Sequence, residues 1–542
     1  MGRLALSEGR PPRGRKAALN SQRRRAAYGG NSMTHNNKMQ SLIPAGREML
    51  MADNLRTAEK LLRWSIVTVS CIWILGCSEP DSPDARYDLA IRNVGVIDVA
   101  GGRTIQDQTV FVRNGTIVEV SDASRANEQA AMLSIDGSGK YVMPALADMH
   151  VHLATPWSAH GAELHQNLSA EIVEDIADEV YLYLANGVTL VRNMGGWPLT
   201  LELRDEITNG SIAGPEIVTA GPIVYGPGLG ALYFHPDQAP GDWADSAQAG
   251  ADIVRRHIEE GYDFIKVYNS MSPDAYNAIV TTAREYGVKV SGHVPFEVGI
   301  WNALKYRQDS IEHLRGYDID PVAPPANPMS DERFAYWLKV SDETMEMYAR
   351  TTAEQSVYNC PTQVVGDGFE FVVSGGSPSN LANYEYLPRP HRKFNEQYEI
   401  FREESIEVML STLPRIRAMI RALHNAGAPL MAGTDTPIYF GIPGFSLHRE
   451  LEHYVEAGLS SLEALRIATI SPAAYLGRQN RWGQVAPGFE ADLIVLKANP
   501  LDDIRNTKSI AGVVVDGQWM SRQVIDERLR EIAQRQADPP ME

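Results

Sequence analysis

The stretch Met143-Pro-Ala-Leu-Ala-Asp-Met-His-Val-His-Leu153 is an apolar, strand-like run with two histidines near its end. His150 and His152 are two residues apart, and side chains at positions i and i+2 of a strand project from the same face. Two imidazoles on one face can bind one metal ion, although an ordinary surface strand also explains such a pair. Four further residues of ligand type follow, each at or near the end of its own β-like run: Lys266, His293, His313 and Asp435.

The middle of the chain alternates strand-like and helical runs, which is the pattern of βα units around a parallel sheet. Eight strands are predicted, at Leu146–Leu153, Val188–Asn193, Glu216–Val224, Asp263–Tyr268, Lys289–His293, Ser310–Leu314, Val357–Gln363 and Pro429–Asp435. Eight such repeats predict an α/β fold, a (β/α)8 TIM barrel, whose functional site lies at the carboxyl ends of the strands. The ligand-type residues meet that condition.

Short strand-like runs separated by turns lie on both sides of this region. One of the turns, Asn114-Gly115, is typical of a hairpin. We therefore predict a small β-sandwich domain built from both ends of the chain, residues 87–143 plus 478–525, around a barrel domain of residues 144–477, with a C-terminal tail at 526–542. The long connections at 226–247, 318–356 and 364–412 either cover the barrel mouth and shape the substrate pocket or decorate the periphery.

The N-terminal residues have the composition of a basic arm followed by an export signal. Residues 1–50 lack hydrophobic periodicity, so we expect disorder or untranslated sequence ahead of a later start. Residues 51–76 combine basic residues with an apolar run too short for a comfortable membrane span. This run ends in Ile74-Leu-Gly-Cys77, which resembles the lipobox of a lipoprotein-type signal peptide. Cys77 would then be lipidated and residues 77–86 would form a linker; a simple secretory signal or an uncleaved anchor is the alternative.

Charge and cysteine content agree with export. Removal of residues 1–76 takes away 13 Lys/Arg and 4 Asp/Glu, which leaves 37 basic and 64 acidic residues. So acidic a chain is a poor binder of nucleic acid or anionic membranes. Beyond Cys77 only Cys360 remains, so no internal disulfide is possible. We expect a periplasmic protein or an outer-membrane-anchored lipoprotein of a Gram-negative bacterium, attached to the membrane only through its lipid.

Each candidate ligand has an ordinary explanation when taken alone. A histidine in a strand is more often a hydrogen-bonded core residue, and Asp435 could merely cap the turn that follows it. Lys266, in Phe264-Ile-Lys-Val-Tyr268, is harder to explain, because a lysine inside an apolar strand is costly unless it is paired or modified. Imidazole and carboxylate bind zinc well. Strands that repeatedly end in such residues therefore predict a metal centre.

At this point the chain resembles the amidohydrolase superfamily, and within it the prolidase-like and imidazolonepropionase-like branch. The resemblance covers residues 87 to about 520. It is carried by the motifs Asp148-Met-His-Val-His152, Ile265-Lys-Val267, Ser291-Gly-His293, Ile311-Glu-His313, Ala432-Gly-Thr-Asp435, Gly444-Phe-Ser-Leu-His-Arg-Glu450 and Ala486-Pro-Gly-Phe-Glu-Ala-Asp-Leu493.

The resemblance implies a binuclear site with two divalent metal ions, most typically zinc. His150, His152 and Asp435 would hold the buried ion and His293 and His313 the more exposed one. A carboxylated Lys266 would bridge the two; mononuclear members of the superfamily lack this lysine. A metal-bridging hydroxide would attack the substrate carbonyl, and Asp435 would be the catalytic base and then acid that passes the proton to the leaving amine.

The sequence departs from the family pattern at the second strand and beside His293. Asn193 stands where relatives usually have Asp, and Val294-Pro-Phe-Glu297 follows His293, which argues against a simple dipeptide substrate. Asn193 and Tyr268 are candidates for the substrate pocket, although Tyr268 could equally pack against a helix. His448 lies beyond the barrel strands and is interpreted as a packing or supporting residue.

The sequence thus predicts a zinc-dependent amidohydrolase that cleaves an amide or peptide-like C–N bond of a small-molecule substrate and binds no nucleic acid. One alternative is a deaminase or cyclic-amide hydrolase on the same scaffold, which would use similar metals. A second is a non-catalytic surface binding lipoprotein that kept the barrel.

Overall fold

The computed structural model of the chain describes residues 86–126, 130–153, 170–227, 241–320, 331–377, 380–396 and 403–537. All of these belong to one of the two compact units of the chain, residues 74–542. The predicted basic arm, the export signal and Cys77 lie outside the described residues, as does most of the predicted linker. Among the described residues, we find no helix that is both long and apolar enough to cross a membrane.

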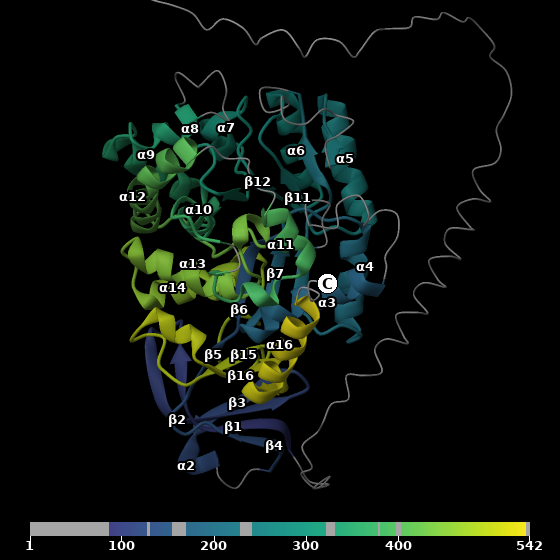
Figure 1. The fold of residues 1–542 in the computed structure, drawn as a ribbon, viewed down its shortest axis with the longest axis vertical. Coiled ribbons are helices and arrows are strands. Elements are labelled where there is room, and N and C mark those ends of the chain that lie inside the picture. The colour runs from purple at the N-terminus through teal and green to yellow at the C-terminus, as the bar shows by residue number, and fades with distance from the viewer. Residues whose placement is uncertain are drawn as a thin grey trace, which may run out of the picture. The chain divides into compact units, whose positions relative to one another are not determined.

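Parallel strands in the middle of this unit form most of a closed ring, with helices on both sides in Figure 1. They are β6 (Leu146–Val151), β7 (Val188–Asn193), β8 (Glu216–Thr219), β11 (Phe264–Val267), β12 (Lys289–Gly292), β13 (Ser310–Glu312) and β14 (Tyr358–Cys360). The first three pair side by side, and so do the last four, all in parallel. A bridge between Ala220 and Phe264 joins the two groups.

Residues 429–436 close the ring between the last strand and the first. Leu430 bridges Asn359 on one side, and Thr436 bridges Val151 on the other. The backbone N–H of Met149 donates to the carbonyl of Ala432 at 2.8 Å. The predicted TIM barrel is therefore confirmed. The predicted strand Pro429–Asp435 makes only these isolated bridges and is not a regular strand.

The predicted third strand is also different, because Glu216–Val224 divides into two strands. Strand β8 ends at Thr219. Strand β9 (Ile223–Tyr225) then continues along the edge of β11 that Ala220 bridges, and it pairs on its other side with β10 (Gly241–Trp243). Most other predicted strands are one to three residues too long, chiefly at their carboxyl ends.

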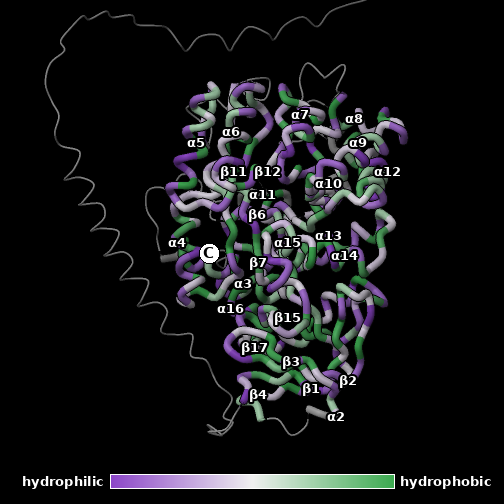
Figure 2. The backbone as a smooth tube through the Cα atoms, turned by 180° about the vertical axis from the view of Figure 1, so that it is seen from behind, coloured by the Kyte–Doolittle hydropathy of each residue, from purple (hydrophilic) through white to green (hydrophobic). Residues whose placement is uncertain are grey.

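Helices surround the ring, and most of those between strands begin at the residues that favour a helix start. The helices are α3 (Ala170–Ala185), α4 (Pro198–Thr208), α5 (Ala247–Glu260), α6 (Pro273–Glu285), α7 (Gly299–Lys305), α8 (Asp331–Tyr336), α9 (Asp342–Gln355), α10 (Val365–Val373), α11 (Arg389–Glu396), α12 (Glu403–Asn425), α13 (Phe445–Glu456), α14 (Ser461–Ile467) and α15 (Ile470–Tyr475). Ser246, Ser272 and Ser341 each accept a backbone N–H at a helix start. In Figure 2 the outer helices alternate purple and green, as expected for helices that cover a core with one face.

Both ends of the described chain contribute to the small β domain that is predicted as a sandwich, and their strands form a single sheet. Its strands are β1 (Tyr87–Asp98), β2 (Arg103–Arg113), β3 (Thr116–Asp122), β4 (Ala131–Asp136), β5 (Tyr141–Pro144), β15 (Leu493–Leu496), β16 (Ile510–Val515) and β17 (Gln518–Ser521), in the order β17-β16-β15-β5-β1-β2-β3 with β4 beside β1. The edge strand β3 also bridges Glu490, just before β15, so the sheet curls around a core. Because β5 runs directly into β6, this sheet anchors the strand that carries His150 and is followed by His152.

The C-terminal segment differs from the predicted tail. Residues up to Gln536 belong to helix α16 (Arg522–Gln536), which lies against α3 and β16 (Figure 1). Arg528 and Arg535 both donate to the buried carboxylate of Asp178 on α3. Helices α10 and α11 of the 364–412 insertion lie near the barrel mouth, because both contact η6 (Ile438–Phe440), which starts three residues after Asp435.

Candidate metal centre

His150 of β6, His152 directly after this strand and Asp435 of the closing segment converge at the carboxyl end of the barrel. Asp435 Oδ1 lies 3.2 Å from His150 Nε2 and 3.0 Å from His152 Nε2. All three side chains are buried, and one ligand atom of each lies within 4.8 Å of the others. The sequence-based grouping of these three residues therefore agrees with their placement.

His293, His313 and Lys266 lie beside this trio. The ring of His313 is 4.5 Å from that of His150 and 5.0 Å from that of His293, measured between centroids. His313 Nε2 is 4.0 Å from Asp435 Oδ2. Lys266 is buried on β11 and acts electrostatically on His152, His293 and His313. The structure thus brings together all six residues that the sequence singled out.

Three of the four imidazoles are oriented by an acceptor at Nδ1. His150 Nδ1 lies 2.8 Å from Glu312 Oε2, His293 Nδ1 lies 2.5 Å from Asn269 Oδ1, and His313 Nδ1 lies 2.6 Å from Thr362 Oγ1. The Thr362 hydroxyl donates to the Pro361 carbonyl, so its oxygen is left to accept from His313. Each Nδ1 therefore carries the proton, and each Nε2 keeps a lone pair for a ligand.

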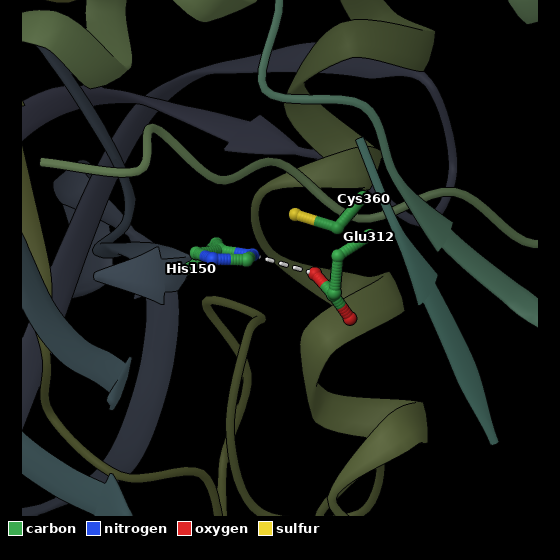
Figure 3. Close-up of side chains that lie close together, drawn as sticks. All are labelled: His150, Glu312 and Cys360. Atoms are coloured by element: carbon green, nitrogen blue, oxygen red, sulfur yellow. Dashed lines mark hydrogen bonds and ion pairs between the residues drawn. The ribbon is translucent and has the colours of Figure 1, made fainter. Parts of the chain in front are cut away.

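Glu312, which precedes His313 in the motif Ile311-Glu-His313, supports the site from β13. Figure 3 shows its carboxylate facing the His150 ring, with the Cys360 sulfur beside them. Its other oxygen accepts from Arg192 Nη2 at 2.8 Å and from the Ser310 hydroxyl. Arg192 also donates through Nε to the Met149 carbonyl at 2.6 Å. This fully buried ion pair therefore connects β6, β7 and β13 beneath the site.

Asp148 of β6, another residue of the sequence motifs, supports the closing segment of the site. Its carboxylate accepts from the backbone N–H of Thr434 at 3.0 Å and from the Thr434 hydroxyl at 2.6 Å. Burial raises the pKa of Asp148 to about 7, although these hydrogen bonds oppose the shift. Asp148 therefore ties the closing segment, which carries Asp435, to the strand that carries His150.

The electrostatic environment favours the forms of these side chains that bind metal. Burial lowers the pKa of His152, and it lowers the pKa values of His293 and His313 further, with help from the Lys266 charge. Burial alone would raise the pKa of Asp435, but His313 and His150 hold it well below its usual range. Burial lowers the pKa of Lys266 to about 8, against the effect of Glu312 and Asp435. Neutral imidazoles and a carboxylate are the forms required of ligands.

Two of the candidate ligands have a left-handed backbone, with φ of 57° at His313 and 61° at Asp435. Such values are uncommon for residues other than glycine and cost free energy. Both residues lie at the end of a barrel segment, where the regular hydrogen bonding between strands stops. The turn at each residue directs its side chain towards the candidate metal centre. This also explains why β13 ends at Glu312, before the predicted limit of Leu314.

The other residues singled out from the sequence, Tyr268, Asn193 and His448, lie in different surroundings. Tyr268 stacks on His293 with ring centroids 4.3 Å apart and also contacts Tyr225. Asn193 is buried. Its amide oxygen accepts from the Leu153 N–H, and its amide nitrogen donates to the Gly195 carbonyl and to the Thr219 hydroxyl, so it fixes the backbone at Leu153, directly after His152. His448 is buried with Nδ1 3.0 Å from Thr507 Oγ1, as expected of a packing residue.

The donor set fits a divalent metal. His150 Nε2 and Asp435 Oδ1 are buried and face each other, yet neither makes a hydrogen bond among the described residues. Buried polar atoms are nearly always bonded, so this unsatisfied pair needs a partner. Nitrogen and oxygen donors of this kind, on rings fixed from behind, suit zinc and similar ions.

Comparisons with known proteins agree with this geometry. A sequence model described as the amidohydrolase family matches residues 141–520. Ochratoxinase of Aspergillus niger is 25% identical over 413 residues, which are 67% of this chain and 72% of the relative. Among solved structures, bottromycin amidohydrolase has a TM-score of 0.61 at 24% identity, over 82% of this chain and 90% of its own. A Xaa-Pro dipeptidase with bound methionine has a TM-score of 0.59 at 22% identity, over 80% and 99%. The two solved structures support the fold.

Proposed function

The chain belongs to the amidohydrolase family, and from that premise we propose that it hydrolyses an amide or peptide-like C–N bond at a centre of two zinc ions. Hydrolysis of C–N bonds and use of a metal follow from the family. Zinc, the number of ions and a peptide-like substrate are our proposals. The observation that supports them best is the convergence of four imidazoles, one carboxylate and one buried amine at one end of the barrel.

The residues divide between two ions according to their contacts. His150, His152 and Asp435 Oδ1 would hold the inner ion, because their atoms already face one another. His293 and His313 would hold the outer ion, since their rings are adjacent and His313 lies on the side of Asp435 Oδ2. When bound, the ions would lower the pKa of a water molecule and polarise a carbonyl oxygen.

Lys266 would join the two groups as a carbamate. Its amine is buried, and burial lowers its pKa to about 8, so part of it is unprotonated near neutral pH. An unprotonated amine can add carbon dioxide with release of a proton, which converts a buried cation into an anionic oxygen ligand. Carboxylation would thus remove the cost of burying an ammonium group.

Asp435 would transfer the proton during hydrolysis. Its Oδ1 is directed at His150 and His152, which leaves Oδ2 as the oxygen to accept a proton from the attacking water and to deliver it to the leaving nitrogen. Tyr268, stacked on His293 and next to Tyr225, would form an apolar wall beside the substrate. The names of the relatives, an ochratoxinase, a dipeptidase and an amidohydrolase, are consistent with a dipeptidase-like reaction on a small molecule.

Replacement of Lys266 by Ala tests the metal proposal. Bound zinc should fall to about one equivalent or none, and hydrolysis should be lost. Lys289→Ala is the matched control, because Lys289 lies at the start of the neighbouring strand β12, at the other end of the barrel from the site. A Lys266→Ala protein with two bound ions and full activity would refute the carbamate bridge.

A substrate panel separates the remaining candidates. The metal-loaded protein would be assayed on dipeptides, N-acyl amino acids and cyclic amides. Turnover of cyclic amides or of a ring amidine alone would favour the cyclic-amide hydrolase or deaminase. A protein that binds no metal would restore the non-catalytic alternative, against which the complete donor set argues.

Export and lipidation at Cys77 remain proposals from the sequence. A Cys77→Ser precursor expressed in a Gram-negative host should lose its membrane association without losing hydrolase activity. Membrane attachment that is unchanged in this variant would contradict lipidation at that residue.

A further inference from the structure

The segment Val294-Pro-Phe-Glu297, at which the sequence departs from the family pattern, forms a tight turn after His293 and leads into helix α7. The Pro295 carbonyl accepts from the Val298 N–H at 3.0 Å, which closes the turn. The backbone at Glu297 is therefore fixed, four residues after a proposed metal ligand.

The Glu297 carboxylate joins this turn to the loop that follows β11. Oε1 accepts from the Ser270 hydroxyl at 2.9 Å, and Oε2 accepts from the Met271 N–H at 3.1 Å. The Phe296 N–H donates to the Asn269 carbonyl at 2.9 Å. Met271 is itself fully buried in an apolar core cluster. These three hydrogen bonds, from here on the loop clamp, hold residues 269–271 against the turn after His293.

The Asn269 side chain connects the loop clamp to the metal centre. Its amide oxygen lies 2.5 Å from His293 Nδ1, and Asn269 is buried. The acceptor at one ring nitrogen of a histidine determines which nitrogen carries the proton and how the ring is oriented. Since Asn269 lies in a loop, the position of its amide depends on the hydrogen bonds that fix this loop.

The loop clamp acts on the outer half of the proposed centre. His293 is a proposed ligand of the outer ion, and Tyr268, which precedes Asn269, stacks on its ring. The inner ligand His150 is supported separately, by Glu312 of β13. Loss of the loop clamp should therefore affect the two ions unequally.

We propose that Glu297 is a positioning residue for the outer metal ion: its carboxylate holds residues 269–271 in place, so that the Asn269 amide fixes His293 with Nε2 free for the ion. This inference rests on the proposed function and adds a residue outside the donor set. The other explanation of the geometry is that Glu297 only stabilises two loops. The two explanations predict different metal affinities and different coupling between variants.

Metal affinity gives the first test. Glu297→Ala removes both acceptors, so competition with a chromophoric chelator should show the second zinc equivalent bound ~10- to 100-fold more weakly and the first unchanged. Glu297→Gln keeps an acceptor for the Met271 N–H, and its amino group can donate to the Ser270 hydroxyl. It should therefore retain most of the affinity. Equal weakening of both equivalents in Glu297→Ala, or a loss in Glu297→Gln as large as in Glu297→Ala, would overturn the proposal.

A double-variant cycle tests whether Glu297 acts through Asn269. Asn269→Ala alone should also weaken the second equivalent, because it removes the acceptor at His293 Nδ1. In the Asn269→Ala background, Glu297→Ala should add little to this loss, since the residue through which it acts is already absent. Losses that simply multiply would show that Glu297 acts independently of Asn269, and the proposal would fail.

Asp309→Ala is the matched control for loop stability. Like Glu297, Asp309 is partly buried and accepts a backbone N–H, that of Val290, at 2.8 Å. This contact lies at the amino end of β12, whereas His293 directly follows the carboxyl end of the same strand. The control should leave both metal affinities unchanged. A weakening of the second equivalent equal to that in Glu297→Ala would mean that loop stability alone determines the affinity, which would contradict the proposal.

Nitrogen NMR of the histidine rings in the metal-free protein provides a readout that depends on neither turnover nor bound metal. His293 of the native protein should carry its proton on Nδ1. Glu297→Ala should show a mixture of the two tautomers, and Glu297→Gln should resemble the native protein. A native protein that binds fewer than two ions would count against the proposed function. The NMR comparison would still decide the role of Glu297, because a His293 tautomer that is unchanged in Glu297→Ala would refute it.

Discussion

Replacement of Glu312 by Gln should damage both stability and metal binding, since one carboxylate serves both. Glu312 and Arg192 are fully buried and 2.8 Å apart. The variant leaves the Arg192 charge buried without its partner, and loss of one member of a buried pair typically costs ~3–5 kcal/mol. We therefore expect the free energy of unfolding of the metal-free protein to fall by about that amount.

Metal binding should weaken because neither orientation of the new amide satisfies its neighbours. If the Gln oxygen faces His150 Nδ1, the Gln amino group faces the Arg192 and Ser310 donors, and donors then oppose donors. If the amino group faces Nδ1, His150 must carry its proton on Nε2, the atom needed for the metal. Loss of such a supporting carboxylate lowers metal affinity ~10- to 100-fold.

Two measurements separate these effects. Urea unfolding in the presence of a chelator gives the stability of the metal-free protein, and competition with a chromophoric chelator gives the affinity. Glu216→Gln is the control, because Glu216 pairs with Arg478 at a half-exposed site where such a change should cost below ~1 kcal/mol. In the double variant Arg192→Met/Glu312→Gln, the loss of stability should be smaller by at least ~1 kcal/mol than the sum of the losses in the two single variants. The double variant should still bind metal weakly. A Glu312→Gln protein with native stability and native affinity would refute the reasoning.

Three other predictions follow from individual contacts. Burial lowers the pKa of Lys266 from 10.5 to about 8, so the unfolded state binds more protons between these values and stability rises with pH there. In buffer free of carbon dioxide and metal, Lys266→Met should therefore be more stable than the native protein by up to ~3 kcal/mol near pH 7. Urea unfolding curves should show that this difference in stability shrinks above pH ~8. A difference that stays constant with pH would contradict the prediction. Thr362→Val removes the acceptor of His313 Nδ1 and should weaken the second metal equivalent ~10-fold in a chelator titration while leaving the first unchanged. Asp178→Ala removes the carboxylate that holds Arg535 of α16; it should lower stability by ~1–3 kcal/mol and speed tryptic cleavage within α16, and unchanged digestion would argue against this role.

The arrangement of strands and the six-residue site could be predicted, because both depend on the periodicity of apolar residues and on the order of strands and helices along the chain. Alternating strands and helices determine a barrel, and a barrel brings the carboxyl ends of its strands together wherever they lie in the sequence. The end of each strand could not be predicted in this way. The apolar run continues through His313 and Asp435, but the backbone turns left-handed at both residues. The sequence pattern carries no signal for this reversal.

The support of the site was missed for a different reason. Lys266 was singled out because a charged residue within an apolar strand needs a partner or a modification. The same argument applies to Arg192 and Glu312, which lie in strands β7 and β13 and prove to be each other's partner. Asn269 and Thr362, in contrast, are ordinary polar residues of loops, and only the folded structure shows that they face His293 and His313.

The acceptors that face Nδ1 of His150, His293 and His313 are not equivalent. The charged acceptor faces the most deeply buried of the three histidines. His150, the most buried of the three, donates to a carboxylate whose charge is fixed by Arg192, whereas His293 and His313 donate to a neutral amide and a neutral hydroxyl. A charged acceptor makes the imidazole a stronger donor to metal than a neutral one does. In the proposed two-ion centre, the inner ion would therefore be held more tightly than the outer one. The outer ion, with the weaker donors, would be the one at which a substrate binds and leaves.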